Sequence, residues 1–456
     1  MMDLKDKHVV VLGLGRSGQA VCRFLLSRQA RVTASEIKSL TELLADKKIR
    51  ELKEAGVTLE AGGHRWETLA QADLIVLSPG VPPLPELEKL KAQGKKILPE
   101  IELAYHFLKG KIVSITGSNG KSTTATLTHK ILSEGGLPAF LAGNIGFPLT
   151  NLVDSSSPSD IYVVELSSFQ LTYIEQFTAE VAVLLNITPD HLDWHPSFDH
   201  YKEAKQRLIL SQPENSLAIL NRDDAHVWEL NAARKALVWA FSLSRPVTPG
   251  MYLEKDWLYL HLDQPTKFLH RQEVPLFGPH NLENIMAAAL VGKYFGLPDS
   301  RIKNSILTFR GLEHRLEKVT SIDGITFFND SKATNVDATL KSIQSFEENL
   351  ILILGGRDKG GDFKQLIPAL KNRVKAAILL GEAKEKIQKA LAGTVPLHPV
   401  SSLVEAVERG YSLARPGDVV LLAPACTSFD MFKNFEERGR RFKEAVLALK
   451  ERVQPK

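Results

Sequence analysis

A nine-residue segment, residues 115–123, combines the residue types that bind nucleotide phosphates. Its order Ile-Thr-Gly-Ser-Asn-Gly-Lys-Ser-Thr follows an apolar, strand-like run at residues 111–114 and leads into a helical pattern over residues 124–134. A glycine-rich turn in that position presents backbone N–H groups and the positive end of a helix dipole to an anion. A turn without a ligand is the alternative, but it does not explain Lys-Ser-Thr at the helix start. The segment therefore predicts a phosphate site.

The residues of this loop have separable tasks. Gly117 and Gly120 let the backbone turn its N–H groups inward, Lys121 supplies a positive charge, and the Ser122 hydroxyl can bind Mg²⁺. The common Walker A motif has four residues between its glycines, so this loop is a shorter variant. The residues predicted to contact ATP here are Gly117, Ser118, Asn119, Gly120, Lys121, Ser122 and Thr123.

A second candidate is Glu165, at the end of the predicted strand 161–166. Ligand sites of open α/β sheets gather at the carboxyl ends of the strands. A carboxylate there is placed to bind Mg²⁺ held by ATP phosphates. The alternative is a capping carboxylate for the next helix.

Residues 186–193, Asn-Ile-Thr-Pro-Asp-His-Leu-Asp, follow another predicted strand at residues 181–187. His191 can act as a metal ligand, although a loop histidine is commonly only solvated, and Asp190 or Asp193 can cap a turn. Residues 201–207 form a charged helical stretch whose default interpretation is an exposed face, so spacing alone does not single out Lys205.

The N-terminal segment contains a second glycine motif, G-x-G-x-x-G at residues 13–18, between a strand at residues 8–12 and a helix at residues 19–27. Glu36 ends the next strand, where an acidic residue can meet a ribose or base. Because a phosphate loop already exists at residue 117, we expect this motif to bind the diphosphate of a second nucleotide. The alternative is close helix–strand packing alone.

Alternation of strands and helices predicts mainly parallel α/β sheets in three domains: a Rossmann-like N-terminal domain (1–107), a central P-loop-type ATPase sheet (108–311) and a Rossmann-like C-terminal domain (312–456). Other strands are expected at residues 31–34, 73–77, 216–221, 350–354, 376–380 and 419–422, and a strong helix at 281–295. Residues 241–275 show short alternating runs with little helical character.

Composition narrows the class of protein. The chain has 456 residues, 44% hydrophobic and 24% charged, with a net charge of +4 from 57 basic and 53 acidic residues. This weak, dispersed charge argues against nucleic acid as a partner. Only Cys22 and Cys426 are present, no signal-peptide core is seen and no apolar run approaches a membrane span, so we expect a cytoplasmic protein without a membrane partner.

Taken together, the motifs resemble the Mur ligases, three-domain enzymes of bacterial cell-wall synthesis, over nearly the whole chain. The segments that carry the resemblance are 117–123, Gly-Asn-Ile-Gly at 143–146, Glu-Leu-Ser-Ser-Phe-Gln at 165–170, 190–193, Ala204-Lys205, 280–284 and His314-Arg315. Folylpolyglutamate synthases share parts of this pattern less completely. The resemblance implies an ATP-dependent amide ligase that converts a substrate carboxylate to an acyl phosphate, which an amine then attacks.

The C-terminal third resembles the branch of the family that adds D-glutamate to UDP-N-acetylmuramoyl-L-alanine in peptidoglycan precursor synthesis. Its segments are 329–335 (Asn-Asp-Ser-Lys-Ala-Thr-Asn), 355–363 and 423–439. Two positions depart from the family's pattern: Glu36, where aspartate is common, and Arg357-Asp358. Another amino-acid acceptor is the main alternative, and the segment at 330–335 discriminates against it.

The resemblance also implies roles for individual residues. Catalysis falls to Lys121, Glu165, His191 and Lys205, and the metal sites to Ser122, Glu165, His191 and Lys205, the last as a carbamate that binds a second Mg²⁺. Further ATP contacts are Asn281, Asn284, Arg315 and Lys332, where Lys332 can equally serve the acceptor. UDP-substrate contacts are Gly15, Arg16, Ser17, Glu36, Ser78, Gly80 and Asn144, and D-glutamate contacts are Thr334, Lys359, Ser428, Phe429 and Phe435. We expect a monomer whose C-terminal domain closes about a hinge near Gly311.

Two other classes of protein compete with this interpretation. A nicotinamide-dependent dehydrogenase accounts for the first glycine motif and Glu36, but it leaves the second phosphate loop unexplained. A non-catalytic nucleotide-binding regulator leaves Glu165, His191 and Lys205 without a task.

Overall fold

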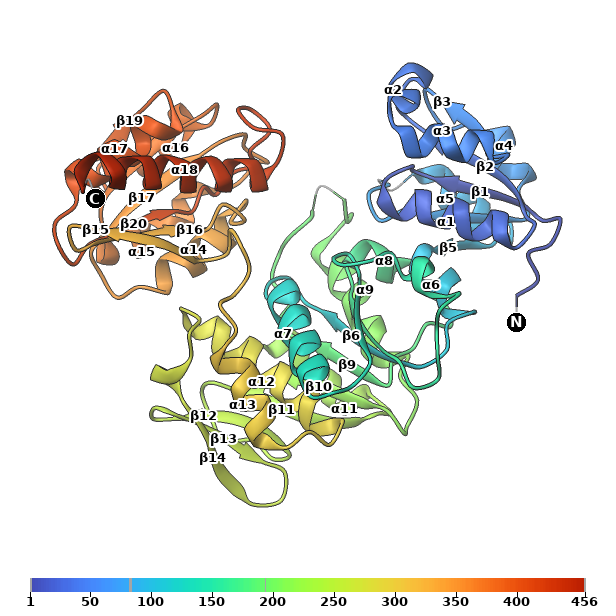
Figure 1. Cartoon of the computed structure of the whole chain (residues 1–456), viewed down its shortest axis with the longest axis horizontal. Coiled ribbons are helices and arrows are strands. Elements are labelled where there is room, and N and C mark those ends of the chain that lie inside the picture. Colours follow the sequence, from blue (N-terminus) through green and yellow to red (C-terminus); the bar gives the residue numbers. More distant parts are fainter. Residues whose placement is uncertain (1, 82–83, 193, 455–456) are drawn as a thin grey trace. The chain divides into compact units, whose positions relative to one another are not determined.

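The computed structural model describes residues 2–81, 84–192 and 194–454, and within these ranges the chain forms three α/β sheets in succession (Figure 1). The three-domain α/β fold class expected from the alternating pattern is confirmed. Asp193, one of the residues considered as a turn cap, lies outside the described ranges. Across the described residues, no helix has the length and apolar character needed to span a membrane.

The N-terminal sheet is parallel throughout, in the order β3-β2-β1-β4-β5. Its strands are β1 (His8–Leu12), β2 (Arg31–Glu36), β3 (Thr58–Ala61), β4 (Leu74–Leu77) and β5 (Ile97–Pro99). The helices are α1 (Arg16–Ser27), α2 (Leu40–Ala45), α3 (Lys47–Glu54), α4 (Trp66–Gln71), α5 (Pro85–Ala92) and α6 (Glu100–Tyr105). Strands β1 and β4 are apolar and buried because helices cover both faces of a parallel sheet. Their carboxyl ends lie side by side.

The central sheet has the order β14-β13-β12-β11-β10-β9-β6-β8-β7 and is parallel except for β13 and β14 at one edge. Its strands are β6 (Lys111–Thr116), β7 (Ala139–Gly143), β8 (Ile161–Glu165), β9 (Val181–Leu184), β10 (Leu217–Asn221), β11 (Leu237–Ser242), β12 (Gly250–Glu254), β13 (Trp257–His261) and β14 (Pro265–His270). Strand β6 pairs with both β8 and β9, so the segments that leave these three strands meet at one edge.

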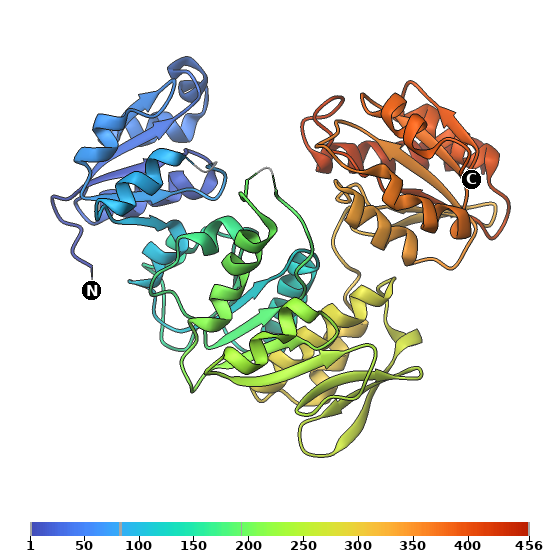
Figure 2. The ribbon, with the colours of Figure 1, turned by 180° about the vertical axis from the view of Figure 1, so that it is seen from behind.

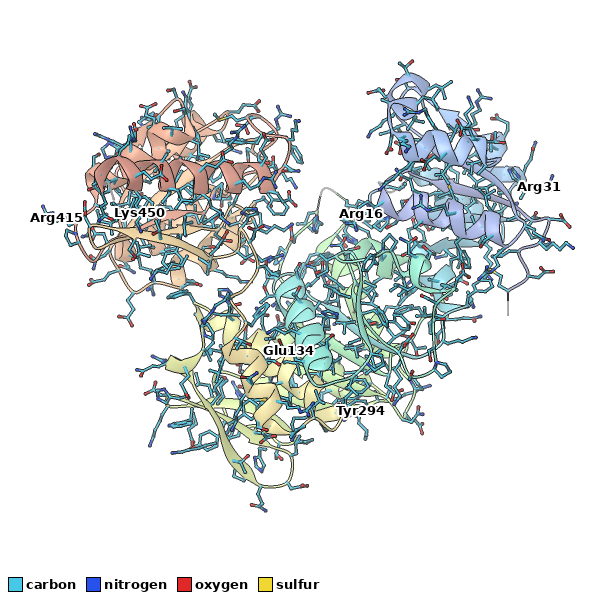
Figure 3. All side chains as sticks on the ribbon, viewed as in Figure 1. Arg16, Arg31, Glu134, Tyr294, Arg415 and Lys450 are labelled. Atoms are coloured by element: carbon cyan, nitrogen blue, oxygen red, sulfur yellow. The ribbon has the colours of Figure 1, made fainter. Side chains whose placement is uncertain are left out.

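Helices and short 3₁₀ turns of the central region connect and cover this sheet (Figure 2). They are α7 (Lys121–Glu134), η1 (Leu149–Leu152), α8 (Ser168–Thr172), α9 (Phe198–Leu210), α10 (Ala225–Trp228), α11 (Leu230–Ala233), η2 (Arg271–Glu273), α12 (Pro279–Tyr294) and α13 (Asp299–Leu307). Helix α13 is tied to α7, because the Ser305 hydroxyl donates a 2.6 Å hydrogen bond to Glu134, which Figure 3 labels.

The C-terminal sheet has the order β15-β16-β20-β17-β18-β19. Its elements are β15 (Glu317–Ile322), β16 (Ile325–Asn329), α14 (Val336–Gln344), β17 (Leu350–Gly355), η3 (Phe363–Leu366), α15 (Ile367–Arg373), β18 (Val374–Leu380), α16 (Lys384–Leu391), β19 (Leu397–Pro399), α17 (Leu403–Leu413), β20 (Val419–Leu422) and α18 (Phe435–Val453). Alternate residues of β17 face opposite cores: Leu352 packs with α14, α15 and α16, whereas Ile351 packs with α17 and α18. The domain is therefore doubly wound.

Contacts divide the chain into two compact units. The first unit holds the N-terminal and central sheets with residues 283–308, and the second holds residues 274–282 and everything from Phe309 onward. The boundary thus falls within α12. The domain limits at residues 107 and 311 stay predictions.

Two buried carboxylates of α6 fasten the N-terminal sheet to the central one. Glu102 accepts hydrogen bonds of 2.8–3.0 Å from the backbone N–H groups of Glu175, Gln176 and Phe177. Glu100 accepts from the backbone and hydroxyl of Thr150, at 2.7 and 2.8 Å. Burial raises the pKa of Glu100. This docking explains why one apolar core runs through both sheets.

We predict that Glu102→Ala destabilises the first unit. Three backbone N–H groups would lose their acceptor, and each buried donor left unpaired costs about 1–3 kcal/mol. The lowest thermal unfolding midpoint should fall by roughly 5 °C or more in scanning calorimetry. The exposed Glu86→Ala in α5 is the matched control and should leave the midpoint within about 1 °C. An unchanged midpoint for Glu102→Ala would contradict the docking role.

Candidate active site

Hydrogen bonds to neighbouring segments help to fix the loop after β6. The Ser118 N–H donates to the Asn186 carbonyl at 2.9 Å, and the Asn119 N–H donates to the Asn186 side chain at 2.8 Å. The Ser118 hydroxyl lies 2.7 Å from the Tyr201 hydroxyl. These bonds fasten the loop to the segment after β9 and to α9.

Gly120 is the position where the loop needs glycine most. Its φ is +89°, and a Cβ there would lie 2.3 Å from Oδ1 of Asn284. That amide oxygen already accepts a 3.1 Å hydrogen bond from the Thr124 hydroxyl. Asn284, predicted to contact ATP, therefore supports the loop from α12.

We predict that Gly120→Ala weakens nucleotide binding at least tenfold, by strain of about 1–2 kcal/mol and by the clash with Asn284. Gly136→Ala is the matched control, because Gly136 has a φ of +88° but its nearest neighbour would be 3.8 Å away. Gly136→Ala should lower the free energy of unfolding because of the backbone strain, and it should leave nucleotide affinity unchanged. Calorimetric titration with an ATP analogue measures both variants. Equal losses of affinity in the two would contradict the clash.

Two lysines share one carbonyl oxygen at the loop. Lys121 donates to the carbonyls of Gly117 and Ser118, both at 2.8 Å, and Lys205 of α9 donates to the same Gly117 oxygen at 2.8 Å. The interpretation of residues 201–207 as an exposed face is wrong for Lys205, which is 1% exposed. Tyr201, Ala204, Lys205 and Leu208 recur at helical spacing and form the buried face of α9.

The environment of Lys205 favours a neutral amine. Burial and then the positive charge of Lys121 hold the pKa of Lys205 well below its ordinary value, while Asp190 and Glu165 oppose the shift. Its Nζ also lies 4.7 Å from the centre of the Tyr201 ring. A buried lysine with a depressed pKa beside a phosphate loop is suited to chemistry rather than to solvation.

Glu165 carries a buried oxygen that has no hydrogen-bond partner among the described residues. Its Oε1 accepts a 2.8 Å hydrogen bond from the Asn144 amide, whereas Oε2 is buried and unpaired. The alternative role as a helix cap is wrong, because Ser167 and Gln170 form the capping box of α8. An orphaned carboxylate oxygen beside a phosphate loop fits a cation ligand.

His191 and Ser122 are the other predicted metal ligands. The centre of the His191 ring lies 4.9 Å from the centre of the Phe169 ring, and its Nε2 lies 3.8 Å from Oδ2 of Asp190. The His191 side chain is 41% exposed. Ser122 is buried at the start of α7. In the ranges that the structure describes, no three His, Cys, Asp or Glu side chains converge on a ready-made metal site. The donor set therefore fits Mg²⁺ only if ATP supplies phosphate oxygens as further ligands.

A cleft of about 380 Å³ opens between the N-terminal and central sheets. All seven residues predicted to contact the UDP substrate line it: Gly15, Arg16, Ser17, Glu36, Ser78, Gly80 and Asn144. Arg16, labelled in Figure 3, donates a 2.7 Å hydrogen bond to the Gly146 carbonyl across the two regions.

The first glycine motif allows close packing of α1 and also lines the cleft. A Cβ on Gly18 would lie 1.8 Å from the Gly13 carbonyl, so this glycine allows α1 to approach β1. Glu36 accepts hydrogen bonds from the backbone N–H groups of Leu14 and Ile37, at 2.8 and 3.0 Å. The acidic residue thus shapes the cleft wall as well as facing it.

The second unit gathers some of the remaining predicted residues. The Lys332 ammonium lies 3.9 Å from the centre of the Phe435 ring. Arg315 lies close enough to the buried Asp330 to lower its pKa, but burial dominates and raises that pKa to about 6. Asn281 donates a 2.6 Å hydrogen bond to the Phe277 carbonyl.

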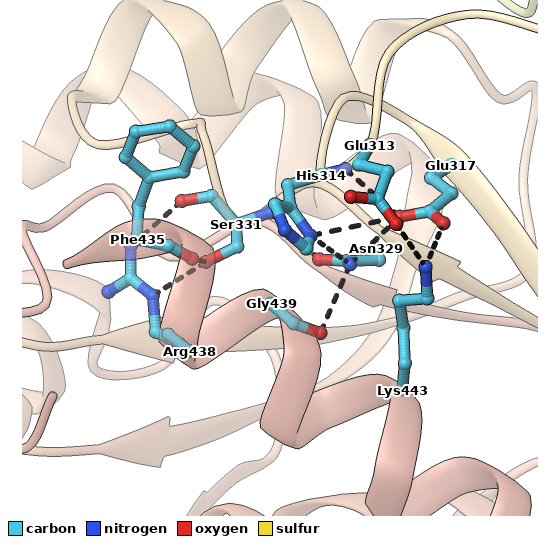
Figure 4. Close-up of polar contacts among 9 residues, drawn as sticks. All are labelled: Glu313, His314, Glu317, Asn329, Ser331, Phe435, Arg438, Gly439 and Lys443. Carbon is cyan, nitrogen blue, oxygen red and sulfur yellow. Dashed lines mark hydrogen bonds and ion pairs between the residues drawn. The ribbon is translucent and has the colours of Figure 1, made fainter.

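Arg438 of α18 is buried and ties together the loops that carry these residues (Figure 4). Its guanidinium donates to the hydroxyl and carbonyl of Ser331, both at 2.9 Å, and to the carbonyls of Cys426 and Thr427, at 3.1 and 3.2 Å. The Ser331 hydroxyl donates in turn to the Phe435 carbonyl at 2.9 Å. Sequence reasoning missed Arg438, since nothing local distinguishes it from the exposed Arg440 and Arg441.

A second network, also drawn in Figure 4, lies beside it. The Asn329 amide donates to His314 and Glu317, at 2.9 and 3.1 Å. Lys443 bridges Glu317 and Glu313, at 2.5 and 3.0 Å. This network fixes the backbone next to Arg315.

Three of the residues predicted to bind D-glutamate, Thr334, Ser428 and Phe429, lie on two loops that touch, whereas Phe435 begins α18 and Lys359 follows β17. The Ala425 N–H donates to the Ala333 carbonyl at 3.0 Å, which joins the Ser428 loop to the Thr334 loop. Ser428 is buried, Phe429 is 59% exposed, and Lys359 is exposed. Contacts that bring Lys359 to Thr334 are not seen among the described residues. The Arg357-Asp358 departure is accommodated by a bidentate pair of Arg357 with Glu382.

Comparison with known proteins assigns the chain to a family. Residues 7–99 match the "Mur ligase MurD-like, N-terminal domain", residues 115–292 the "Mur ligase middle domain", and residues 314–426 the "Mur ligase, glutamate ligase domain". The chain belongs to the Mur ligase family.

Similar full-length relatives carry a common name. A protein of Acidobacterium capsulatum is 46% identical, covering 98% of this chain and 97% of its own, and one of Caldanaerobacter subterraneus subsp. tengcongensis is 42% identical, covering 98% and 100%. Both are called UDP-N-acetylmuramoylalanine--D-glutamate ligase. A pseudomurein peptide ligase type C from Methanothermus fervidus shares the fold, with a TM-score of 0.60, 20% identity, and coverage of 97% and 100%.

Proposed function

We propose that the chain is an ATP-dependent ligase that adds D-glutamate to UDP-N-acetylmuramoyl-L-alanine in peptidoglycan precursor synthesis. The observation that carries this proposal is Asn144. It lines the cleft suited to the UDP substrate, and its amide also holds Glu165 at the phosphate loop. A substrate that lies in the cleft would thus extend its carboxylate toward the phosphate donor. The names of the relatives supply the acceptor amino acid.

The reaction makes an amide from a carboxylate in two steps. A carboxylate oxygen attacks the γ-phosphorus of ATP and ADP departs, which leaves an acyl phosphate. The amine of D-glutamate then attacks the acyl carbon, loses a proton and displaces phosphate. Lys121 and the N–H groups of the loop stabilise charge on the transferred phosphoryl group.

When bound, Mg²⁺ would supply positive charge that offsets the negative charge of the phosphates, and two ions are proposed. Ser122, Glu165 and His191 would hold it, supported by the orphaned Oε2 of Glu165. Lys205 joins them as a carbamate. Its neutral amine would add to CO₂ and lose one proton, which would convert the amine into an anionic, carboxylate-like ligand.

The second unit supplies the acceptor site. Thr334, Ser428 and Phe429 stand on touching loops, Phe435 begins α18, and Lys359 adds a cation for one of the two carboxylates of D-glutamate. The stacking of Lys332 on Phe435 supports a position on the acceptor side. Asn281 and Arg315 are proposed for ATP. We also propose a monomeric cytoplasmic enzyme without membrane or nucleic-acid partners, because ATP and nucleotide-activated precursors are cytoplasmic metabolites.

The test incubates the purified protein with ATP, Mg²⁺ and UDP-N-acetylmuramoyl-L-alanine against a panel of amino acids. Phosphate release and product mass are measured for each. D-glutamate alone should give product. Preference for a diamino acid, or oxidation of NADH in place of ATP turnover, would overturn the assignment.

A further inference from the structure

His64 lines the substrate cleft from the loop that follows β3. Backbone hydrogen bonds hold this loop, from Gly62 to the Lys38 carbonyl at 2.9 Å and from Gly63 to the Glu36 carbonyl at 3.2 Å. In the sheet, β2 separates β3 from β1, which leads into the glycine motif. His64 therefore stands beyond Glu36, at the end of the cleft away from the diphosphate-binding turn.

A chain of hydrogen bonds fixes which nitrogen of His64 carries the proton. Glu60 accepts from the hydroxyls of Ser35 and Thr68, at 2.8 and 2.6 Å, and from the Arg65 N–H at 2.9 Å. A carboxylate only accepts, so the single hydroxyl proton of Ser35 goes to Glu60. The Ser35 oxygen lies 2.9 Å from Nδ1 of His64 and can then only accept from it. The proton of the neutral ring thus sits on Nδ1.

The remaining nitrogen of the ring is an acceptor. Burial lowers the pKa of His64, although the charges of Glu36 and Glu60 act in the opposite direction. The hydrogen bonds to Glu60 outweigh its burial and lower the pKa of that carboxyl, which keeps it ionised. At neutral pH, Nε2 of His64 consequently carries a lone pair and no proton.

We propose that Nε2 of His64 accepts a hydrogen bond from the nucleoside end of the UDP substrate, and that Ser35 and Glu60 are positioning residues that hold the acceptor tautomer. The proposal rests on the proposed function, which places a uridine nucleotide in this cleft. The donors at that end are the imide N3–H of uracil and the ribose hydroxyls. A protonated or Nε2–H ring could not accept from the imide N3–H, and with a ribose hydroxyl it would donate instead of accept.

The binding test uses His64→Leu, which keeps apolar bulk and removes the acceptor. Calorimetric titrations compare UDP with 3-methyl-UDP, 2′-deoxy-UDP and 3′-deoxy-UDP, each lacking one donor. The wild-type protein should bind UDP up to about tenfold tighter than the analogue that lacks the relevant donor, and His64→Leu should lose that discrimination. Glu67→Gln, an exposed neighbour in α4, should behave as wild type. Equal discrimination by His64→Leu and wild type would overturn the proposal.

A second measurement needs no nucleotide. Nitrogen-15 NMR of the wild-type protein should show the Nδ1–H tautomer of His64 at pH 7.5, and Ser35→Ala should reduce its population. A dominant Nε2–H tautomer in the wild type would overturn the proposal even if UDP binds. If UDP and the UDP substrate fail to bind the wild type while the tautomer is as stated, the proposed function fails and the hydrogen-bond chain stands.

Discussion

Lys205→Ala is expected to lower the ligase rate by at least 10³-fold, and small carboxylates such as formate or acetate are expected to restore part of it. The physical reason is the position of Lys205. It is 1% exposed and contacts the Gly117 carbonyl of the phosphate loop, and burial beside Lys121 depresses its pKa. Removal of a group that places charge at the transferred phosphoryl costs several kcal/mol in the transition state. Phosphate release at saturating substrates measures both the loss and the rescue.

The control for this prediction comes from the same helix. Lys202 of α9 pairs with Asp199 and Glu229, at 3.8 and 3.6 Å, away from the loop. Lys202→Ala should keep the rate within about threefold and should not respond to added carboxylates. Unchanged activity in Lys205→Ala would remove the lysine from the reaction. Lost activity without any rescue would argue against a carboxylate-like form of the side chain.

Arg438→Met is expected to lower the free energy of unfolding of the second unit by about 3–5 kcal/mol. Methionine keeps much of the volume but removes the donors of the Ser331 and Cys426 carbonyls, and it leaves the Thr427 carbonyl with the Arg357 N–H alone. Because these carbonyls belong to the loops that carry Thr334 and Ser428, KM for D-glutamate should rise more than kcat falls. Calorimetry and steady-state kinetics measure the two effects.

A pair of further variants separates the charge of Arg438 from its geometry. Arg438→Lys keeps the charge but not the fork of donors, so it should recover only a small part of the stability. Arg441→Met removes an exposed arginine three positions on, whose side chain is 62% exposed, and should be silent. Full stability in Arg438→Lys would show that the charge alone matters.

Local patterns predicted much of this fold because the strands nearest the site are continuous apolar runs followed by glycine or acidic residues. Strand β1 was predicted at residues 8–12 and found at His8–Leu12, and β20 at residues 419–422 and found at Val419–Leu422. The seven cleft residues were identifiable for the same reason, since each lies in a short motif. Short edge strands such as β3 and β19 carry too few apolar residues to be recognised.

Residues that support the site through distant neighbours escaped prediction. Tyr201 and Asn186 hold the phosphate loop from 83 and 67 residues away, and their partners are set by the pairing of β6 with β9. His64 depends in the same way on β3 lying next to β2. The buried face of α9 shows a related limit, because the residue type alone does not tell whether a lysine side chain is buried or exposed to water.

Lys121 and Lys205 both donate to the Gly117 carbonyl. The loop carbonyl and the phosphates of a nucleotide therefore compete for the same lysine donors. If Lys121 exchanges its two loop carbonyls for phosphate oxygens when ATP binds, the measured affinity reflects a difference between two sets of hydrogen bonds. The exchange also leaves the Gly117 oxygen to Lys205 alone. Nucleotide binding and the protonation or carbamate formation of Lys205 are therefore thermodynamically linked, so a change in one equilibrium should shift the other.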